Sequence, residues 1–217
     1  MTNSNTLYVT CLTVCALSIT AQAQFSVRGI DAPAGSTNDI NQAETLLASQ
    51  PTAGTDSPAV INYFDGAIDA TFPGGTLFPG LGNTEYYALD ATGFLTFNTA
   101  GSYVFRVNSD DGFRLRFDGN VVSEFVNARA PGFTDTAPIL FSVGSTTSLR
   151  LTYFEQAGGD EVELSYSLNG GPQALVGSSN DITVRAVATG TVPEPATTVG
   201  LLGLSMAAML VFRNRCR

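Results

Sequence analysis

The feature that most constrains the fold is a period-two alternation of apolar and polar residues from Tyr86 to Val187. In SYVFRVN, the residues Tyr103, Phe105 and Val107 occupy every second position, and SLRLTYFE and EVELSYS repeat the pattern. Successive side chains of a strand point to opposite faces, so these runs predict strands with one buried face. Gly and Asp turns separate the runs at intervals of about 8 to 12 residues, which is typical of antiparallel sandwiches. We expect residues 24–190 to form one all-β, jelly-roll-like antiparallel sandwich.

One segment has helical spacing instead. NDINQAETLLAS can begin at a cap on Asn38 or Asp39 and then places apolar residues three or four apart, at Ile40, Ala43, Leu46 and Leu47. We therefore predict a short helix at 39–49. Residues 51–58 and 73–83 are rich in Pro and Gly and are expected to be loops.

The alternating pattern also predicts the direction in which each strand runs and the end of the sandwich at which each loop lies. We expect strands at 102–108, 113–118, 120–126, 137–142 and 147–155. If each short connection reverses the chain, the loops 109–112, 127–136 and 156–160 lie at the same end. Carboxylates that are distant in sequence, on Asp110, Asp111 and Glu155, would then meet in space.

The N-terminus has the layout of a signal peptide. Leu7 to Ile19 is apolar, and Ala21-Gln22-Ala23 fits a small-x-small cleavage site, so residues 1–23 would be removed. MTNSNT contains no Lys or Arg, so only the α-amino group charges the start of the segment. A buried N-terminal strand is the alternative.

The C-terminus has the layout of a membrane anchor. Residues 196–212 carry no charge, and Arg213, Arg215 and Arg217 follow at once. About 17 apolar residues is the lower limit for spanning a bilayer, and arginines stay on the cytoplasmic side. We expect a transmembrane helix at 196–212, with residues 24–195 outside the membrane; a buried C-terminal helix would leave the three arginines unexplained.

This tail resembles a known sorting signal. Pro193-Glu194-Pro195, a short apolar helix and a terminal arginine cluster are similar to the PEP-CTERM signal, here over residues 191–217. The resemblance implies processing by an exosortase while the chain is held in the inner membrane. It also implies a Gram-negative host that makes exopolysaccharide, and delivery to the outer surface or the extracellular matrix.

Composition excludes much chemistry. The chain has no His, Lys or Trp, and its three cysteines, Cys11, Cys15 and Cys216, all lie in the terminal signals. Without His or Lys, residues 24–190 can form no Ser-His triad and no Schiff base, and without Cys they have no thiol nucleophile and no disulfide. A net charge of −9 argues against nucleic acid as a partner. Oxygen ligands remain, and these suit a hard cation such as calcium.

The stretch NSDDGFRLRFDG places two carboxylates side by side. Two carboxylates roughly 4 Å apart in water repel by about 1 kcal/mol. A turn needs only one Asp before its glycine, so a turn alone does not explain why both Asp110 and Asp111 are present. Read alone, Ser109 to Gly112 is a hairpin turn, as are Asp65-Gly66 and Asp118-Gly119. A cation between the two carboxylates is the other interpretation.

YVFRVNSDDGFRLRFDGNVV and LRLTYFEQAGGDEVELSY resemble the protective-antigen-type β-sandwich domain, over residues 24–187. The resemblance implies that Asp110 and Asp111, joined by a cis peptide, chelate calcium, which in turn binds sugar hydroxyls. Glu155 stands where the flocculin-like adhesin members carry Asn, which keeps an oxygen ligand and adds charge. Asp160 would be a further metal ligand, and Gly112, Gly158 and Gly159 would line the ligand site.

Three functions follow from these features. The first is a calcium-dependent, lectin-like module for adhesion, with a glycan or exopolysaccharide as partner. The second is a structural spacer of the matrix that has the same fold without a working site. The third is a glycosidase, whose two carboxyl groups must lie about 5–5.5 Å or 6.5–9.5 Å apart. Carboxylates gathered round one cation would be closer, so we expect a binding module and no enzyme.

Overall fold

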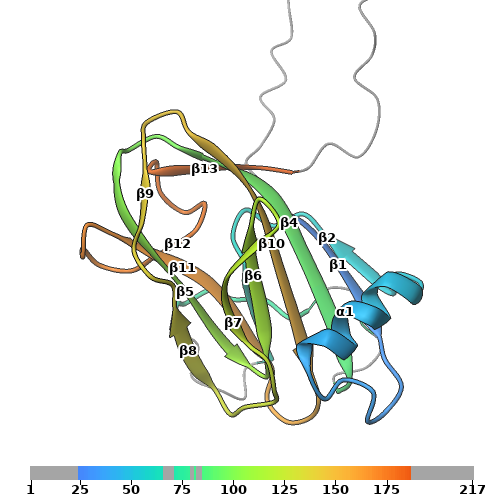
Figure 1. Cartoon of the computed structure of the whole chain (residues 1–217). Coiled ribbons are helices and arrows are strands. Elements are labelled where there is room, and N and C mark those ends of the chain that lie inside the picture. Colours follow the sequence, from blue (N-terminus) through green and yellow to red (C-terminus); the bar gives the residue numbers. More distant parts are fainter. Residues whose placement is uncertain (1–23, 66–70, 79–80, 82–84, 187–217) are drawn as a thin grey trace, which may run out of the picture.

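Two antiparallel β-sheets lie face to face in the computed structural model (Figure 1). The structure describes residues 24–65, 71–78, 81 and 85–186. Within these residues the first sheet has seven strands, in the order β2 (Gly54–Asp56), β1 (Ser26–Asp31), β4 (Tyr87–Phe97), β10 (Thr146–Glu155), β6 (Phe113–Phe117) and β7 (Asn120–Phe125), with β13 (Ile182–Arg185) also pairing with β4. The second sheet has six described strands, in the order β12 (Ala174–Leu175), β11 (Glu161–Leu168), β5 (Gly101–Asp110) and β8 (Gly132–Asp135), with β3 (Asn62–Phe64) on β11 and β9 (Ile139–Phe141) on β5.

The alternating residues form the core between the sheets. Each apolar residue that the alternation assigned to one face of 103–107, 113–117, 149–153 or 162–166 is buried. Phe105 of β5 meets Phe117 of β6 edge to face, with ring centroids 4.8 Å apart, so aromatic contacts join the two sheets. The prediction of an all-β sandwich is confirmed.

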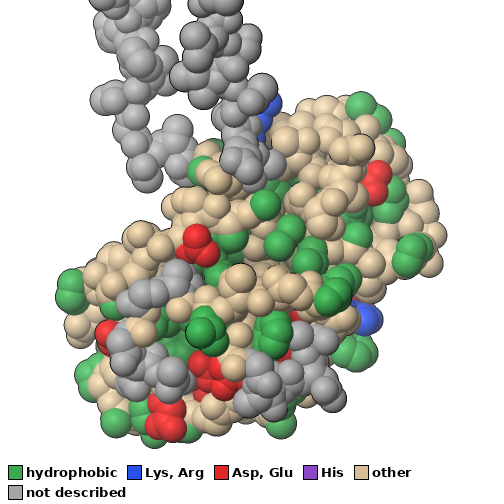
Figure 2. Space-filling model, turned by 180° about the vertical axis from the view of Figure 1, so that it is seen from behind, with side chains coloured by type: hydrophobic (Ala, Val, Ile, Leu, Met, Phe, Trp, Pro, Cys, Tyr) green, Lys and Arg blue, Asp and Glu red, His purple; other side chains and the backbone are tan. Residues whose placement is uncertain are grey.

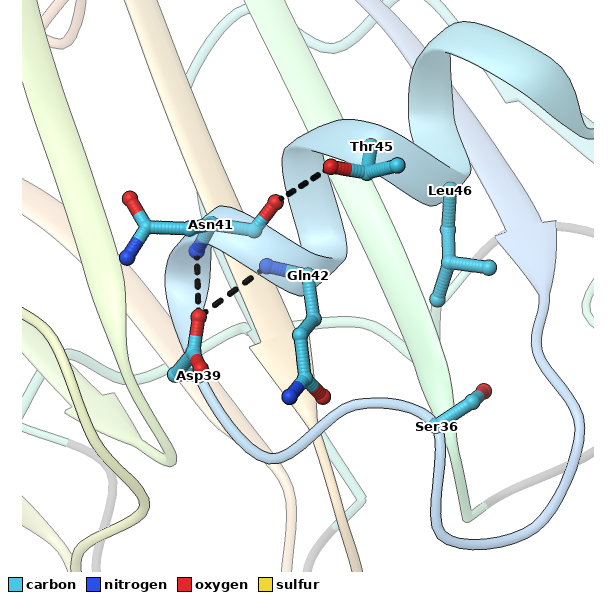
Figure 3. Close-up of a pocket in the computed structure, with 6 residues that line it drawn as sticks. All are labelled: Ser36, Asp39, Asn41, Gln42, Thr45 and Leu46. Carbon is cyan, nitrogen blue, oxygen red and sulfur yellow. Dashed lines mark hydrogen bonds between the residues drawn. The ribbon is translucent and has the colours of Figure 1, made fainter.

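Helix α1 (Ile40–Ser49) lies on the outer face of the first sheet (Figure 1). Asp39 is its N-cap: the carboxylate accepts hydrogen bonds from Asn41 N at 2.8 Å and Gln42 N at 3.0 Å (Figure 3). The buried stripe packs on the sheet in a cluster that contains Ile30, Ile40, Ala43, Leu47, Ala88 and Phe154. The predicted helix is confirmed, and of the two predicted caps the structure selects Asp39.

Two segments predicted as loops contain short strands. β2 lies within 51–58 and β8 within 127–136, while the strand predicted at 137–142 is reduced to β9. These are short pieces paired along one neighbour: β2 pairs with β1, and β8 pairs with β5. Short strands of this kind are held by backbone hydrogen bonds and do not need an alternating apolar pattern. The prediction that these two segments are only loops was therefore wrong.

The connection at 110–112 is not a hairpin within one sheet. β5 belongs to the second sheet and β6 to the first, so the chain crosses between the sheets at Asp110, Asp111 and Gly112. By contrast, β6 and β7 pair directly through Asp118-Gly119, with φ of 48° and 80°. The second of these turns is the expected hairpin, and the first is a crossover.

The predictions for the chain ends lie outside the described residues. These are the signal peptide at 1–23 and the sorting signal at 191–217 with its helix at 196–212. Among the residues that the structure describes, no helix has the length and apolar character needed to cross a bilayer. The predicted helix at 196–212 therefore stays a prediction.

Candidate functional site

Two long strands from different sheets end beside each other and bring three carboxylates together. β5 ends at Asp110 and β10 ends at Glu155. One carboxylate oxygen from each of Asp110, Asp111 and Glu155 lies within 4.8 Å of the others. The three residues are only 8%, 5% and 0% exposed, and the peptide bond between the two aspartates is cis. The structure thus places these residues where the alternation and chain direction predicted.

Backbone amides from two neighbouring loops hold Asp111. Its Oδ1 accepts a hydrogen bond from Arg129 N at 2.9 Å, and its Oδ2 accepts one from Gln156 N at 2.8 Å. Each oxygen of Asp111 is therefore fixed by one donor. The side chain is oriented before any ligand binds, which lowers the entropic cost of binding.

Tyr153 connects the other two acids. Its hydroxyl lies 2.9 Å from Glu155 Oε2 and is also in contact with the backbone carbonyl of Asp110. The second oxygen of Glu155, Oε1, is buried and has no hydrogen-bond partner among the described residues. A buried carboxylate oxygen without a donor is costly, so this atom points to a missing partner in the cluster.

Arg129 is a site residue that sequence reasoning missed. Its guanidinium donates to Ser109 O at 3.1 Å and to Ser109 Oγ at 2.8 Å, and it lies over the Phe125 ring at 4.6 Å from the centroid. Ser109 Oγ in turn donates to Asp111 O at 2.7 Å. Arg129 therefore fixes the backbone on both sides of the aspartate pair. In the sequence, Arg129 could have been singled out only because it lies in loop 127–136, which was predicted to be at the site, and because the domain has few arginines.

The remaining predicted site residues take separate places. Asp160 is 1% exposed and its Oδ2 accepts from Tyr87 OH at 2.9 Å, but it is not part of the three-carboxylate group. Its Oδ1 has no hydrogen-bond partner within the described part of the chain. Gly158 is exposed with φ of 117°, and Gly159 is half-buried beside it, so both lie in the loop that follows Glu155.

Gly112 is packed against neighbours rather than exposed to a ligand. A Cβ on Gly112 would lie 2.5 Å from Phe154 Cε1, 2.7 Å from Phe125 O and 2.8 Å from Asn127 O. Two of these three atoms are backbone carbonyls that cannot rotate away. The structure thus gives Gly112 a packing role at the crossover between the sheets.

We expect Gly112→Ala to destabilise the protein by about 1–3 kcal/mol, because the added methyl group overpacks a site closed by backbone. Chemical denaturation in the presence of a chelator measures this without any contribution from a bound cation. Gly132→Ala is the matched control, since a Cβ there meets only Ala130 O at 3.7 Å. Equal stability of the two variants would contradict the packing role.

Burial and mutual repulsion raise the pKa values of the carboxyl groups at the site. Burial, and then the charges of Asp111 and Asp160, raise the pKa of Glu155 to about 9. Burial and the charge of Asp111 raise the pKa of Asp110 to about 6. Burial raises the pKa of Asp160 to about 7, with a further increase from the charge of Asp65. When its acids are ionised, the three-carboxylate cluster therefore has more negative charge than its surroundings neutralise.

Acidic side chains are also visible on the surface. Figure 2 shows several of them in the lower part of the face that is turned away from the viewer in Figure 1.

Without a cation, the protein should lose stability as the pH rises. The pKa of Glu155 is raised from 4.5 to about 9, so the folded state holds its proton more tightly than the unfolded state. The resulting stabilisation is complete below about pH 4.5 and is lost as the pH rises toward 9. Denaturant unfolding in chelator at a series of pH values should show this decline. Glu155→Gln should make the decline smaller, leaving the part that comes from Asp110 and Asp160. If the free energy of unfolding does not change between about pH 4.5 and 9, the raised pKa assigned to Glu155 is wrong.

The cluster has the chemistry of a site for a hard cation. Its side-chain oxygens all belong to carboxylates, the kind of ligand that calcium prefers. One oxygen from each of the three carboxylates lies within 4.8 Å of the others, so a single ion could contact all three groups. Asp110, Asp111 and Glu155 are the residues that would hold the ion.

Comparisons with known proteins place the fold and the tail. The PA14 domain model matches residues 43–180, and the PEP-CTERM protein-sorting motif matches residues 191–215. Comparison with curated proteins gives no match.

The fold is similar to that of several solved structures, including two PA14 domains and an adhesin domain. A PA14 sugar-binding domain from an RTX adhesin is 21% identical and has a TM-score of 0.58, covering 71% of this chain and 95% of its own. The PA14 domain of the MpAFP antifreeze protein is 18% identical with a TM-score of 0.59, covering 83% and 100%. The epithelial adhesin 9 A domain from Candida glabrata, in complex with Galβ1-3GlcNAc, is 11% identical with a TM-score of 0.59, covering 82% and 96%. At these identities the likeness establishes the fold alone.

Proposed function

The chain belongs to the PA14 domain family, and we propose that it is a carbohydrate-binding module that holds its ligand through a calcium ion. Asp110, Asp111 and Glu155 are the proposed protein ligands of the ion. The observation that carries the proposal is the meeting of three buried carboxylates, one of which has an oxygen without a hydrogen-bond partner among the described residues. A cation at this point would remove both the mutual repulsion and the unpaired oxygen.

Calcium leaves room for sugar oxygens in such a site. The ion accepts about six to eight oxygen ligands. If each of the three carboxylates contributes one oxygen, several coordination positions remain for other ligands. Backbone carbonyls of loop 156–160 and vicinal hydroxyl groups of a sugar are suitable further ligands. Gly158 is exposed in this loop and has no side chain that could block the approach of a sugar ring. Asp160, the last residue of this loop, interacts electrostatically with Glu155 and would add negative charge near the proposed ion.

Glu155 distinguishes this site from the amide-containing sites that the family resemblance implies. A carboxylate in place of an amide increases the charge of the ligand set and therefore the affinity for a divalent cation. The cost is a buried charge in the cation-free protein: burial, and then repulsion by Asp111 and Asp160, raise the pKa of Glu155. We infer that this site depends more strongly on its cation than an amide-containing site does.

The sorting motif supports action outside the cell. The match at 191–215 indicates a secreted, surface-sorted protein. We propose that the chain is exported, processed by an exosortase at the inner membrane, and displayed on the outer surface or in the matrix of a Gram-negative bacterium. Its glycan partner would then be an exopolysaccharide or a carbohydrate of a neighbouring surface. No Lys or His contributes to the site, which agrees with a binding role rather than catalysis.

A glycan array probed with the purified protein tests the proposal. Binding to a defined set of sugars in calcium, with loss of binding in chelator and recovery on adding calcium back, is the expected result. Asp118→Asn serves as the control, because it removes one charge at the hairpin turn between β6 and β7 and leaves the cluster intact. Binding that is unaffected by chelator would reject the calcium mechanism. No binding to any glycan would favour the alternative, a structural spacer of the matrix.

A further inference from the structure

A second group of buried polar residues lies on the outer face of the second sheet. Across β3, β11 and β5, Asn62 is opposite Glu163, and Glu163 is opposite Asn108. Glu161 is two residues before Glu163 on β11 and therefore points to the same face. Directly opposed residues of neighbouring strands share a face, so these four side chains lie together, away from the apolar core.

These side chains are almost completely buried. Glu161 is 0%, Glu163 1%, Asn62 5% and Asn108 9% exposed. The segment 71–78 contacts them: Glu163 accepts hydrogen bonds from Thr71 N at 3.1 Å and Phe72 N at 2.9 Å. Two neighbouring carboxyl groups therefore lie under a covering segment, where water cannot screen their repulsion.

Asn108 holds the two carboxyl groups side by side. Its Nδ2 donates to Glu161 Oε1 at 2.5 Å and lies 3.3 Å from Glu163 Oε2. No arginine forms an ion pair with either glutamate in the described part of the chain. A single amide donor between two buried carboxyl groups does not neutralise their charge.

Among the described residues, two oxygens of the group have no hydrogen-bond partner. Glu161 Oε2 and Asn62 Oδ1 are buried and accept no hydrogen bond from any described residue. The side-chain amide of Asn62 donates to Phe72 O at 3.5 Å, and the backbone N–H of Phe72 donates to Glu163. The Asn62 amide therefore lies next to the pair of carboxyl groups. Buried acceptors of this kind normally have a donor or a bound ion.

Gly75 keeps space open beside Asn62. A Cβ there would lie 2.9 Å from Asn62 Oδ1 and 2.1 Å from Phe64 Cε1, so any larger residue would press against the amide oxygen. The unpartnered oxygen therefore faces a position that only glycine leaves free.

We propose that Glu161, Glu163 and Asn62 form a second divalent-cation site, one that prefers oxygen ligands. The ion would fix the segment 71–78 onto the outer face of β3 and β11. Asn108 is a positioning residue that holds the two carboxylates at this site. The site shares no ligand with the cluster of Asp110, Asp111 and Glu155, and the proposal does not depend on glycan binding.

The test is the number of calcium ions bound per chain, measured by equilibrium dialysis of the purified protein. Two are expected for the wild type and one for Glu161→Gln, which keeps the acceptor for Asn108 but removes the charge. One is also expected for Asp111→Asn, and the double variant should bind none. One ion in the wild type that persists in Glu161→Gln and is lost in Asp111→Asn would overturn the second site and leave the proposed function standing.

Other results separate the two proposals further. One ion that is lost in Glu161→Gln and kept in Asp111→Asn would support the second site and reject the first, whereas no bound ion would reject both. Asn62→Asp guards against a misfolded variant: an added carboxylate should raise the calcium affinity of the second site at least about tenfold. A variant that is merely less stable, with unchanged calcium binding, would show that the two glutamates share a proton and bind no cation.

Discussion

Asp111→Asn is expected to lower calcium affinity at the site by at least about 100-fold and to abolish cation-dependent glycan binding. Unit charges 4 Å apart interact by about 4 kcal/mol at an effective dielectric of about 20, and about 2.8 kcal/mol corresponds to a factor of 100. Both oxygens of Asp111 are already fixed by the amides of Arg129 and Gln156. The amide group of Asn would place an N–H₂ against one of these donors as well as removing the charge. Calorimetric titration with calcium measures the loss.

Related variants separate charge from geometry. Asp110→Asn should have an effect similar to that of Asp111→Asn, whereas Glu155→Gln should weaken calcium binding less because an amide oxygen still ligates. Asp118→Asn should leave calcium binding unchanged. If Asp111→Asn and Asp118→Asn bind calcium equally well, the adjacent aspartates serve only the crossover between β5 and β6, and the proposed calcium site is wrong.

The second large effect is the stability of the protein with and without calcium. A ligand that binds only the folded state stabilises it by RT ln(1 + [L]/Kd), which is about 2.7 kcal/mol at a hundredfold excess over Kd. For a chain of this length, each kcal/mol corresponds to a shift in Tm of about 2–4 °C, so calcium should raise Tm by about 5–11 °C over chelator. The shift should be larger at neutral pH than at pH 5, because protons compete for Glu155.

Magnesium is the control for this measurement. It demands near-ideal octahedral geometry and gives up its water reluctantly, so a crowded set of carboxylates selects against it. Melting curves of the wild type that superimpose in calcium and in chelator would mean that the repulsion between Asp110, Asp111 and Glu155 is relieved by protons alone.

The alternating pattern was sufficient to predict most of the fold and the meeting of the site residues. Because side chains alternate strictly along a strand, Tyr103 and Val107 had to face the same core as Leu151. Chain reversal at short connections then placed the ends of β5 and β10 together. That reasoning held even though β5 and β6 lie in different sheets, since the crossover at 110–112 also reverses the chain.

The parts that could not be predicted depend on tertiary packing. The side chain of Arg129 acts on the site through Ser109, which is 20 residues away in sequence and adjacent only in the fold. The role of Gly112 is defined by carbonyl groups of β7 and the loop after it, which no local pattern reveals. Asn62 and Glu163 meet because the short strand β3 pairs with β11, and β3 shows no alternation long enough to be recognised.

The most direct test of the central claim is the coupling between calcium and glycan in the wild-type protein. With a glycan identified on the array, calorimetry measures glycan affinity in calcium and in chelator, and calcium affinity with and without the glycan. If the ion at Asp110, Asp111 and Glu155 contacts the sugar, each ligand raises the affinity of the other by the same factor. Glycan binding that is equal in calcium and in chelator, alongside measurable calcium binding, would contradict the account.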